Sequence, residues 1–436
     1  DPNPHLIAFT NGVLNTLTAT FHPTGGSDAG SAAAQLSEQE LSDESMALLQ
    51  KLAAEHNAKA GSHETAEQYL KTCTNTQPCM FVPNFYDPNL MTMTMEDLEN
   101  KCTSLKEILE YQGIPNDPVK EGQEHTRTDV RLWIYALIGR TMIMYADRAD
   151  RWQIALFFLG CAGTGKSTIL NMIAKFFPPQ TVKAMEDEGE GTFGLMTFVK
   201  EFTRIIIASE IPTTMPMAQI AKCISHEAVS VPIKHGGAMP IPTWGPEFVF
   251  AGNFFPQQGN TGGRMSRRYV IVPFNKPVTN QKSDIEVHIQ QNLAAYITLC
   301  VRAYYMISRK YGKSDFFRTA PPFFSAQARS QYVQSNLLAL YLSSPEFTFG
   351  PQYETPLPVI VKAAKEHARQ SGQAAMADMR NQLITTNLTS ICTALGLSLS
   401  DESKNTVWED DGREYSGRCV RGIYPTHLIS QLVGCC

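Results

Sequence analysis

The sequence lacks any apolar run approaching the roughly 18–20 residues that a membrane-spanning helix needs. Its first residues also lack the basic-then-apolar pattern of a signal peptide, and the chain contains neither an internal repeat nor a low-complexity tract. The ten cysteines are scattered, and most lie alone in apolar segments, as do Cys223, Cys300 and Cys392. This usage is typical of reduced thiols in an intracellular protein and argues against a disulfide framework.

Charged residues make up only 18% of the 436 residues, and they are unevenly distributed. The whole chain has 37 Lys/Arg and 42 Asp/Glu, a net charge of −5. Residues 1–125 carry 6 Lys/Arg against 18 Asp/Glu, so the remaining residues carry a net charge of +7. The charge balance argues against a non-specific DNA coat, which would need a net basic surface, so any DNA contact should be local and can come from the later part of the chain.

The length predicts two to four domains, and we divide the chain into four segments. Helical periodicity, including 95–112 and 128–147, predicts an acidic, mainly helical N-terminal domain over residues 1–148. The second and third segments are an α/β core over residues 149–280 and a helical extension over residues 281–354. The fourth, residues 355–436, combines helical stretches with a hairpin pattern near 407–424 and predicts a winged-helix-like domain.

Within the core, short runs that are apolar on both faces alternate with helical patterns. Such runs are typical of buried strands in a parallel sheet covered by helices. The predicted strands are Ile154–Leu159, Arg204–Ala208, Phe248–Ala251 and Tyr269–Val272.

The strongest motif follows the first of these strands. Its nine residues match G-x-x-x-x-G-K-[ST] and lead into a helical pattern: Gly160, Cys161, Ala162, Gly163, Thr164, Gly165, Lys166, Ser167 and Thr168. In a strand–loop–helix setting, the glycines let backbone N–H groups converge on phosphate oxygens at a helix N-terminus. Lys166 is predicted to reach the β- and γ-phosphates of a nucleoside triphosphate, and the Ser167 hydroxyl to ligate Mg²⁺.

Two further polar residues follow predicted strands. Glu210 comes just after Arg204–Ala208 and is predicted to support Mg²⁺ and orient the attacking water. Asn253 follows Phe248–Ala251 and can hydrogen-bond both the γ-phosphate and that water, although asparagine at a strand end is often only a turn residue. Its place in the order of strand ends favours a γ-phosphate sensor.

A basic segment precedes the last predicted strand. It holds Arg264, Arg267 and Arg268, which could simply form a solvated surface. A guanidinium can also contact two oxygens of a γ-phosphoryl group in the transition state. We therefore predict a finger that enters the active site of a neighbouring subunit, in a ring with heterologous interfaces.

The order of these motifs resembles superfamily 3 helicases, a branch of the AAA+ ATPases, and Lys166 and Asn253 are only 87 residues apart. The chain most resembles the helicase part of the primase–helicases of poxviruses and other nucleocytoplasmic large DNA viruses. Weaker resemblance outside residues 150–275 lies in four segments: Asn3–Val13, Thr192–Leu195, Tyr332–Leu342 and Tyr415–Tyr424.

The resemblance implies a P-loop AAA+ core and an ATP-driven, replicative DNA helicase that translocates on single-stranded DNA as a hexameric ring. It implies ATP and Mg²⁺ as cofactors, an intracellular viral replication site, and primase or polymerase partners. It makes Arg268 the finger, with Arg267 in reserve, because the family's arginine directly precedes the strand. A pore hairpin would occupy Ser230–Pro242, with Lys234 and His235 contacting DNA; without the family, Lys234 reads as an ordinary surface lysine.

The sequence departs from the family at two points. Many members have two adjacent acids after the second strand, whereas here Ser209 takes the first place, so Glu210 must serve both roles or be helped by another acid. No primase site is visible, and the chain opens at Asp1 where the helical domain would begin. We expect the helicase part of a larger protein, or a stand-alone version of it.

Two other functions are compatible with the same predicted nucleotide-binding residues. A non-helicase AAA+ ATPase for genome packaging, protein remodelling or loading would share every one of them but would not be stimulated by single-stranded DNA. A binding module with a vestigial ATPase would be favoured only by Ser209.

Overall fold

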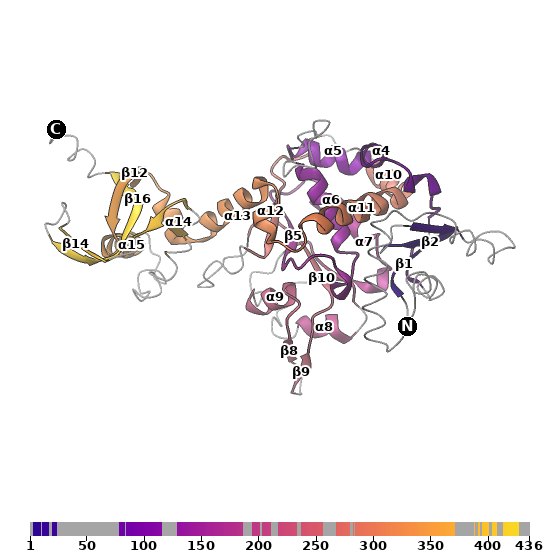
Figure 1. Cartoon of the computed structure of the whole chain (residues 1–436), viewed down its shortest axis with the longest axis horizontal. Helices are drawn as coiled ribbons and strands as arrows, with labels where there is room; N and C mark the ends of the chain where they lie inside the picture. Colours follow the sequence, from indigo (N-terminus) through magenta and orange to yellow (C-terminus); the bar gives the residue numbers. More distant parts are fainter. Residues whose placement is uncertain are drawn as a thin grey trace. The chain divides into compact units, whose positions relative to one another are not determined.

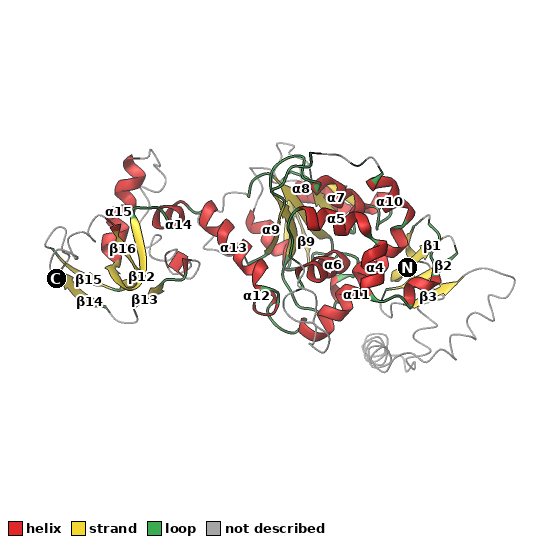
Figure 2. Ribbon diagram, turned by 90° about the horizontal axis from the view of Figure 1, so that it is seen from above, coloured by secondary structure: helices red, strands yellow, loops and turns green. Residues whose placement is uncertain are grey.

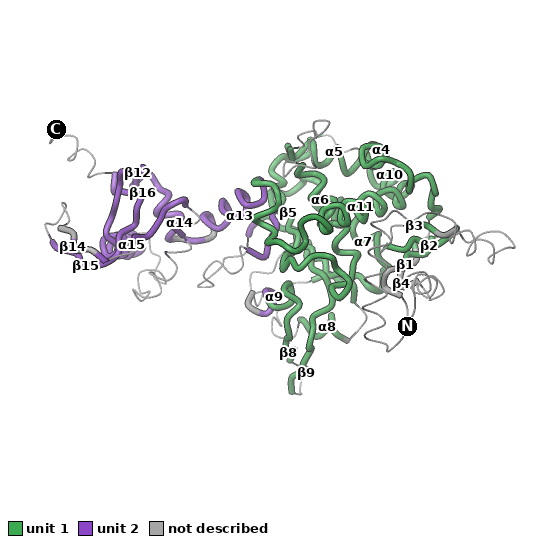
Figure 3. Tube along the Cα trace, viewed as in Figure 1, with its two compact units in different colours: residues 1–211, 222–253, 272–322 green, residues 212–221, 254–271, 323–436 purple. Residues whose placement is uncertain are grey.

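The structure is a computed structural model. It describes residues 3–9, 11–16, 20–23, 78–82, 84–115, 129–185, 194–200, 203–210, 217–232, 237–255, 267–279, 282, 284–370, 388, 391–392, 395–400, 403–407 and 413–426. The chain divides into two compact units (Figure 3). Unit 1 comprises residues 1–211, 222–253 and 272–322, and unit 2 comprises residues 212–221, 254–271 and 323–436.

A five-stranded sheet forms the centre of the α/β core, in the order β11-β5-β10-β7-β6. Its strands are β5 Ala155–Leu159, β6 Val182–Ala184, β7 Ile205–Ala208, β10 Glu247–Gly252 and β11 Tyr269–Pro273. β10 runs parallel to both β5 and β7, and β6 runs parallel to β7. All residues of β5 and β10 are buried, as expected for strands covered on both faces. The four predicted core strands are confirmed, and β6 was not predicted.

Helices α6 (Val130–Arg140) and α11 (Leu293–Tyr311) pack side by side (Figures 1 and 2). Every residue of α6 is buried, which fits a helix that is apolar around most of its surface. The Asp129 carboxylate caps its first turn by accepting from the Leu132 N–H at 3.0 Å. The other described α-helices before residue 322 are α4 Met95–Lys101, α5 Thr103–Tyr111, α7 Lys166–Ala174, α8 Gly194–Lys200, α9 Met217–Ile224, α10 Ile285–Gln291 and α12 Phe316–Thr319.

The N-terminal segment contains a sheet that was predicted to be helical. Its strands pair in the order β3-β2-β1-β4 and are labelled together in Figure 3: β1 Asn3–Phe9, β2 Gly12–Asn15, β3 Thr20–Pro23 and β4 Pro78–Phe81. The prediction of a mainly helical domain is therefore wrong for these segments. Phe9 pairs with Gly12, so the chain reverses direction within a few residues, which excludes a continuous helix over this segment.

Long-range contacts hold this sheet in unit 1. The Phe21 ring stacks on Tyr86 with centroids 4.1 Å apart, and Phe9 meets the same ring edge-on at 5.0 Å. The Asn11 side chain accepts from the Tyr86 N–H at 2.7 Å and donates to its carbonyl at 2.8 Å. Since these partners are more than 60 residues apart in the sequence, no local pattern could indicate that the sheet packs on Tyr86.

A two-stranded hairpin of β8 (Val229–Pro232) and β9 (Ala238–Ile241) extends away from the parallel sheet (Figure 1). It occupies the predicted hairpin position, and its antiparallel register pairs Pro232 with Ala238. The predicted tip residues Lys234 and His235 lie outside the described residues.

Unit 2 has its own apolar core, to which the fully buried Ile360, Ala364, Leu388 and Ile423 contribute. A three-stranded sheet in the order β12-β16-β13 packs with helices, and β14 and β15 form a separate hairpin. The elements are α13 Pro322–Ser335, α14 Leu337–Leu342, β12 Phe347–Pro356, α15 Leu357–Gln370, β13 Ser398–Leu399, β14 Lys404–Val407, β15 Glu414–Gly417 and β16 Cys419–Pro425. The predicted hairpin is corrected in one respect: residues 419–424 pair with β12, not with β14.

Of the helices that the structure describes, none is both long enough and apolar enough to span a membrane.

Candidate functional site

The phosphate loop leaves the carboxyl end of β5 and enters α7 at Lys166. Gly160 is required by a close approach, because a Cβ at this position would lie 1.9 Å from the Phe274 carbonyl oxygen. Gly165 caps α7 with φ +94°, a conformation that favours glycine. The loop therefore delivers the first N–H groups of α7 to the carboxyl edge of the sheet, where they can bind an anion.

The loop is held in place from two directions. The Phe274 N–H donates to Leu159 O at 2.7 Å, and the Val278 N–H donates to Gly163 O at 2.8 Å. From α5, the Gln112 side chain donates to Thr164 O at 3.0 Å. The same amide also donates to Lys276 O at 2.8 Å and accepts from the Lys276 N–H at 2.9 Å. Gln112 thus joins the loop to the segment after β11.

The Lys166 ammonium lies over the loop, with 8% of the residue exposed. It donates to the carbonyls of Gly160 at 2.7 Å and Cys161 at 2.6 Å, and its Nζ lies 3.3 Å from Asn253 Oδ1. Burial lowers the pKa of Lys166, while Cys161 and Glu210 act in the opposite direction. Lys166 therefore contacts Asn253 directly, and the charge of Glu210 acts on it.

The strand register explains why these residues meet. Leu159 of β5 lies beside Gly252 of β10, and Phe250 lies beside Ala208 of β7. Parallel strands present their carboxyl ends at one edge, so the residues that follow them converge. Asn253 directly follows β10, and Glu210 follows β7 with only Ser209 between them. Both residues are exposed at this edge.

This edge offers oxygen ligands suited to Mg²⁺. Ser167, at the second position of α7, and Glu210 are both exposed, and so are open to a ligand. Among the described residues, no group of three or more His, Cys, Asp or Glu side chains could hold a metal by itself.

The basic segment is described only from residue 267. Arg267 is exposed and Arg268 is half-buried, and Arg268 directly precedes β11 as predicted. Their roles, like those of Lys234 and His235, stay predictions.

No family model matches the chain, and neither does any curated protein. Among solved structures, it is similar to an A form apo structure of the NrS-1 C-terminal region, with 12% identity and a TM-score of 0.37, over 73% of this chain and 75% of that one. A second structure of this region, residues 305–718, matches at 12% identity and a TM-score of 0.32, over 85% and 90% of the two chains. Likeness of this degree assigns neither a family nor an activity.

Sequence reasoning missed Gln112 and a buried charged cluster around Glu247. Gln112 lies 52 residues from Thr164 and 164 from Lys276, so no local pattern marks it. Glu247 contacts Arg148 and His226, which lie 99 and 21 residues before it in the sequence. An acid at the start of an apolar strand was the one available signal, since such a residue is buried only with partners.

Proposed function

We propose that this chain is an ATP-driven motor, a replicative DNA helicase of viral type that translocates on single-stranded DNA as a ring. The observation that carries the proposal is the contact between Lys166 and Asn253, which joins the phosphate loop to the end of the adjacent strand. A phosphate loop alone indicates nucleotide binding; together with an asparagine and an acid at neighbouring strand ends, it supports hydrolysis.

In the proposed reaction, water attacks the γ-phosphorus of ATP and the bond to the β–γ bridging oxygen breaks, giving ADP and phosphate. Lys166 would leave its carbonyl partners and neutralise the phosphate oxygens. Glu210 would orient the water and accept its proton, and Asn253 would hydrogen-bond the γ-phosphate. Bound Mg²⁺, held through Ser167 and Glu210, would supply charge neutralisation at the β- and γ-oxygens.

Two roles in the proposal come from the sequence alone. Arg268, with Arg267 as the alternative, would act in the site of the adjacent subunit. Lys234 and His235 would contact the DNA backbone at the hairpin tip. A non-helicase AAA+ ATPase that packages genomes or remodels proteins is the second candidate, because it would use the same ATP residues.

Two substitutions test the proposal in ATPase and strand-displacement assays. Lys166→Ala should lose both activities, with hydrolysis falling at least about 100-fold because transition-state charge is no longer neutralised. Lys234→Ala should keep ATP hydrolysis but lose strand displacement. Normal unwinding by Lys234→Ala would overturn its DNA-binding role, and hydrolysis that ignores single-stranded DNA would favour the second candidate.

A further inference from the structure

A buried charged cluster lies at the amino end of β10, the end opposite Asn253. Glu247 is the first residue of β10 and is 7% exposed. Its carboxylate pairs with Arg148, lies 3.2 Å from His226 Nε2, and lies 3.6 Å from Arg140 Nη1. Asp150 in turn pairs with Arg140 at 3.0 Å. Buried charges persist only with such partners, so the geometry of this cluster is tightly constrained.

His226 joins this cluster to the hairpin. Its Nδ1 lies 2.7 Å from Trp244 O, and because a carbonyl oxygen only accepts, Nδ1 donates. His226 comes just before β8, and Trp244 comes just after β9, so this bond links the two strands where they leave the body of unit 1. The Tyr145 ring stacks on the imidazole at 4.0 Å, and His226 has φ +55°. A non-glycine residue held in that conformation indicates that its surroundings fix it.

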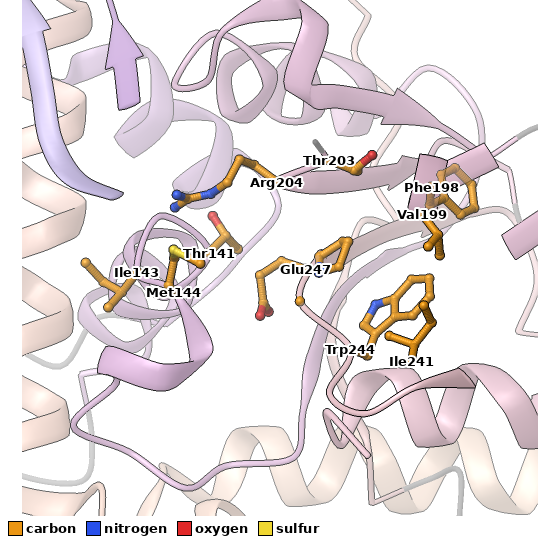
Figure 4. A pocket seen from close by; sticks show the side chains of 12 residues that line it. Thr141, Ile143, Met144, Phe198, Val199, Thr203, Arg204, Ile241, Trp244 and Glu247 are labelled. Carbon is orange, nitrogen blue, oxygen red and sulfur yellow. The ribbon is translucent and has the colours of Figure 1, made fainter. Parts of the chain in front are cut away.

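A cavity of about 450 Å³ lies beside the hairpin base (Figure 4). Its walls come from the hairpin exit (Ile241 and Trp244), from α8 (Phe198) and from Glu247. The Trp244 indole N–H is buried and has no acceptor among the described residues. Figure 4 shows this nitrogen on the side of the ring that faces Glu247. The hairpin base therefore borders unfilled volume, and one of its buried donors has no partner among the described residues.

We propose that Glu247 and His226 are positioning residues that transmit the state of the ATP site to the hairpin, an inference that rests on the proposed function. β10 connects the proposed ATP site to the charged cluster, because Asn253 follows its last residue and Glu247 is its first residue. Its ends are about 17 Å apart at the rise of an extended strand, and β5 and β7 hydrogen-bond both its edges. A shift of β10 when the γ-phosphate leaves Asn253 therefore moves the Glu247 carboxylate, and through His226 the Trp244 carbonyl.

The substitution His226→Asn tests this relay. Asparagine tolerates positive φ and keeps an N–H donor, but it is too short to reach both Trp244 O and Glu247. We expect a folded protein whose ATP hydrolysis without DNA stays within twofold of wild type, while the DNA strands displaced per ATP hydrolysed fall at least tenfold. Glu247→Gln keeps the shape of the side chain and should likewise retain ATP hydrolysis while displacing fewer DNA strands per ATP. This variant tests the relay if His226→Asn does not fold.

A matched control is Tyr135→Phe, which removes the buried hydroxyl that donates to Glu99 at 2.9 Å in unit 1. It should lower the unfolding temperature without changing the strands displaced per ATP. The relay is overturned if folded His226→Asn and Glu247→Gln displace as many DNA strands per ATP hydrolysed as wild type. It is also overturned if ATP hydrolysis and strand displacement fall by the same factor, because that result would indicate a structural role. Absence of DNA-dependent hydrolysis in the wild type overturns the proposed function instead.

Discussion

At the scale of single residues, the site depends on positions where one atom more or one charge less has a large effect. Gly160 has no room for a Cβ, and Lys166 is held by the carbonyls that the loop turns toward it. Glu247 is a buried carboxylate that stays ionised because its neighbours are cationic. Each of these residues gives a separate prediction.

Gly160→Ala should push the phosphate loop away from Phe274. The added carbon would lie 1.9 Å from a backbone oxygen, so the backbone must move, which we expect to cost about 2–4 kcal/mol of unfolding free energy. ATP binding should be lost in the same variant. Gly237→Ala is the matched control, because no atom of the residues that the structure describes lies within 4 Å of its added carbon, and it should stay within about 1 kcal/mol of wild type in urea unfolding. Equal stability of the two variants would contradict the close approach.

Glu247 should make stability depend on pH. Burial by itself would raise the pKa of this carboxyl, but Arg148, the His226 side chain 3.2 Å away and Arg140 outweigh it and lower the pKa to about 2. The folded state therefore binds fewer protons than the unfolded state below about pH 5. The resulting stabilisation, about 3 kcal/mol, is complete above that pH and is lost as the pH falls toward 2.

Urea unfolding of wild type and Glu247→Gln measures this contribution. The stability gap between them should narrow steadily from pH 5 to pH 3. Glu354→Gln, which removes a solvent-exposed partner of Arg421, should show a gap below about 1 kcal/mol at every pH. A constant gap for Glu247→Gln would mean that the carboxylate is not stabilised by these cations.

At the scale of elements, the sequence predicted the local features well. The four core strands are each a short apolar run, and 95–112 forms α4 and α5 with a break at Cys102. The pairing of β1 with β4 could not be predicted because their paired residues lie more than 70 positions apart, whereas β1, β2 and β3 pair with their sequence neighbours and their local hairpins were overlooked. The convergence of Glu210, Asn253 and Lys166 was predictable because parallel strands share one carboxyl edge. The Gln112 clamp and the Glu247 cluster were not, because their partners come from distant elements.

The clamp between α5 and the phosphate loop gives a prediction at this scale. Gln112→Ala leaves Thr164 O and both backbone groups of Lys276 without their partner. ATP affinity should fall about tenfold, the effect expected for losing 1–3 kcal/mol of buried hydrogen bonding. Titration calorimetry with ATP measures it. Gln331→Ala, which removes only an exposed bond to Gln334 on α13, should bind ATP as wild type does; equal affinities would rule out the clamp.

At the scale of the whole molecule, the account requires that copies of the chain complete one another's active sites. Arg268→Ala and Lys166→Ala should each be inactive alone. If subunits assort at random, an equal mixture should recover roughly a quarter of the wild-type ATPase rate, because that share of interfaces combines an intact Lys166 with an intact neighbouring Arg268. A mixture no faster than its separate components would place the arginine outside the neighbour's site. Arg267→Ala in the same experiment tests the alternative finger.

The most direct test of the central claim is the steady-state rate of ATP hydrolysis per subunit, measured across protein concentrations with and without single-stranded DNA. The account predicts a rate that single-stranded DNA raises at least several-fold, and that falls on dilution as subunits separate. A rate that is unchanged by dilution and by DNA would contradict a ring-shaped motor on DNA.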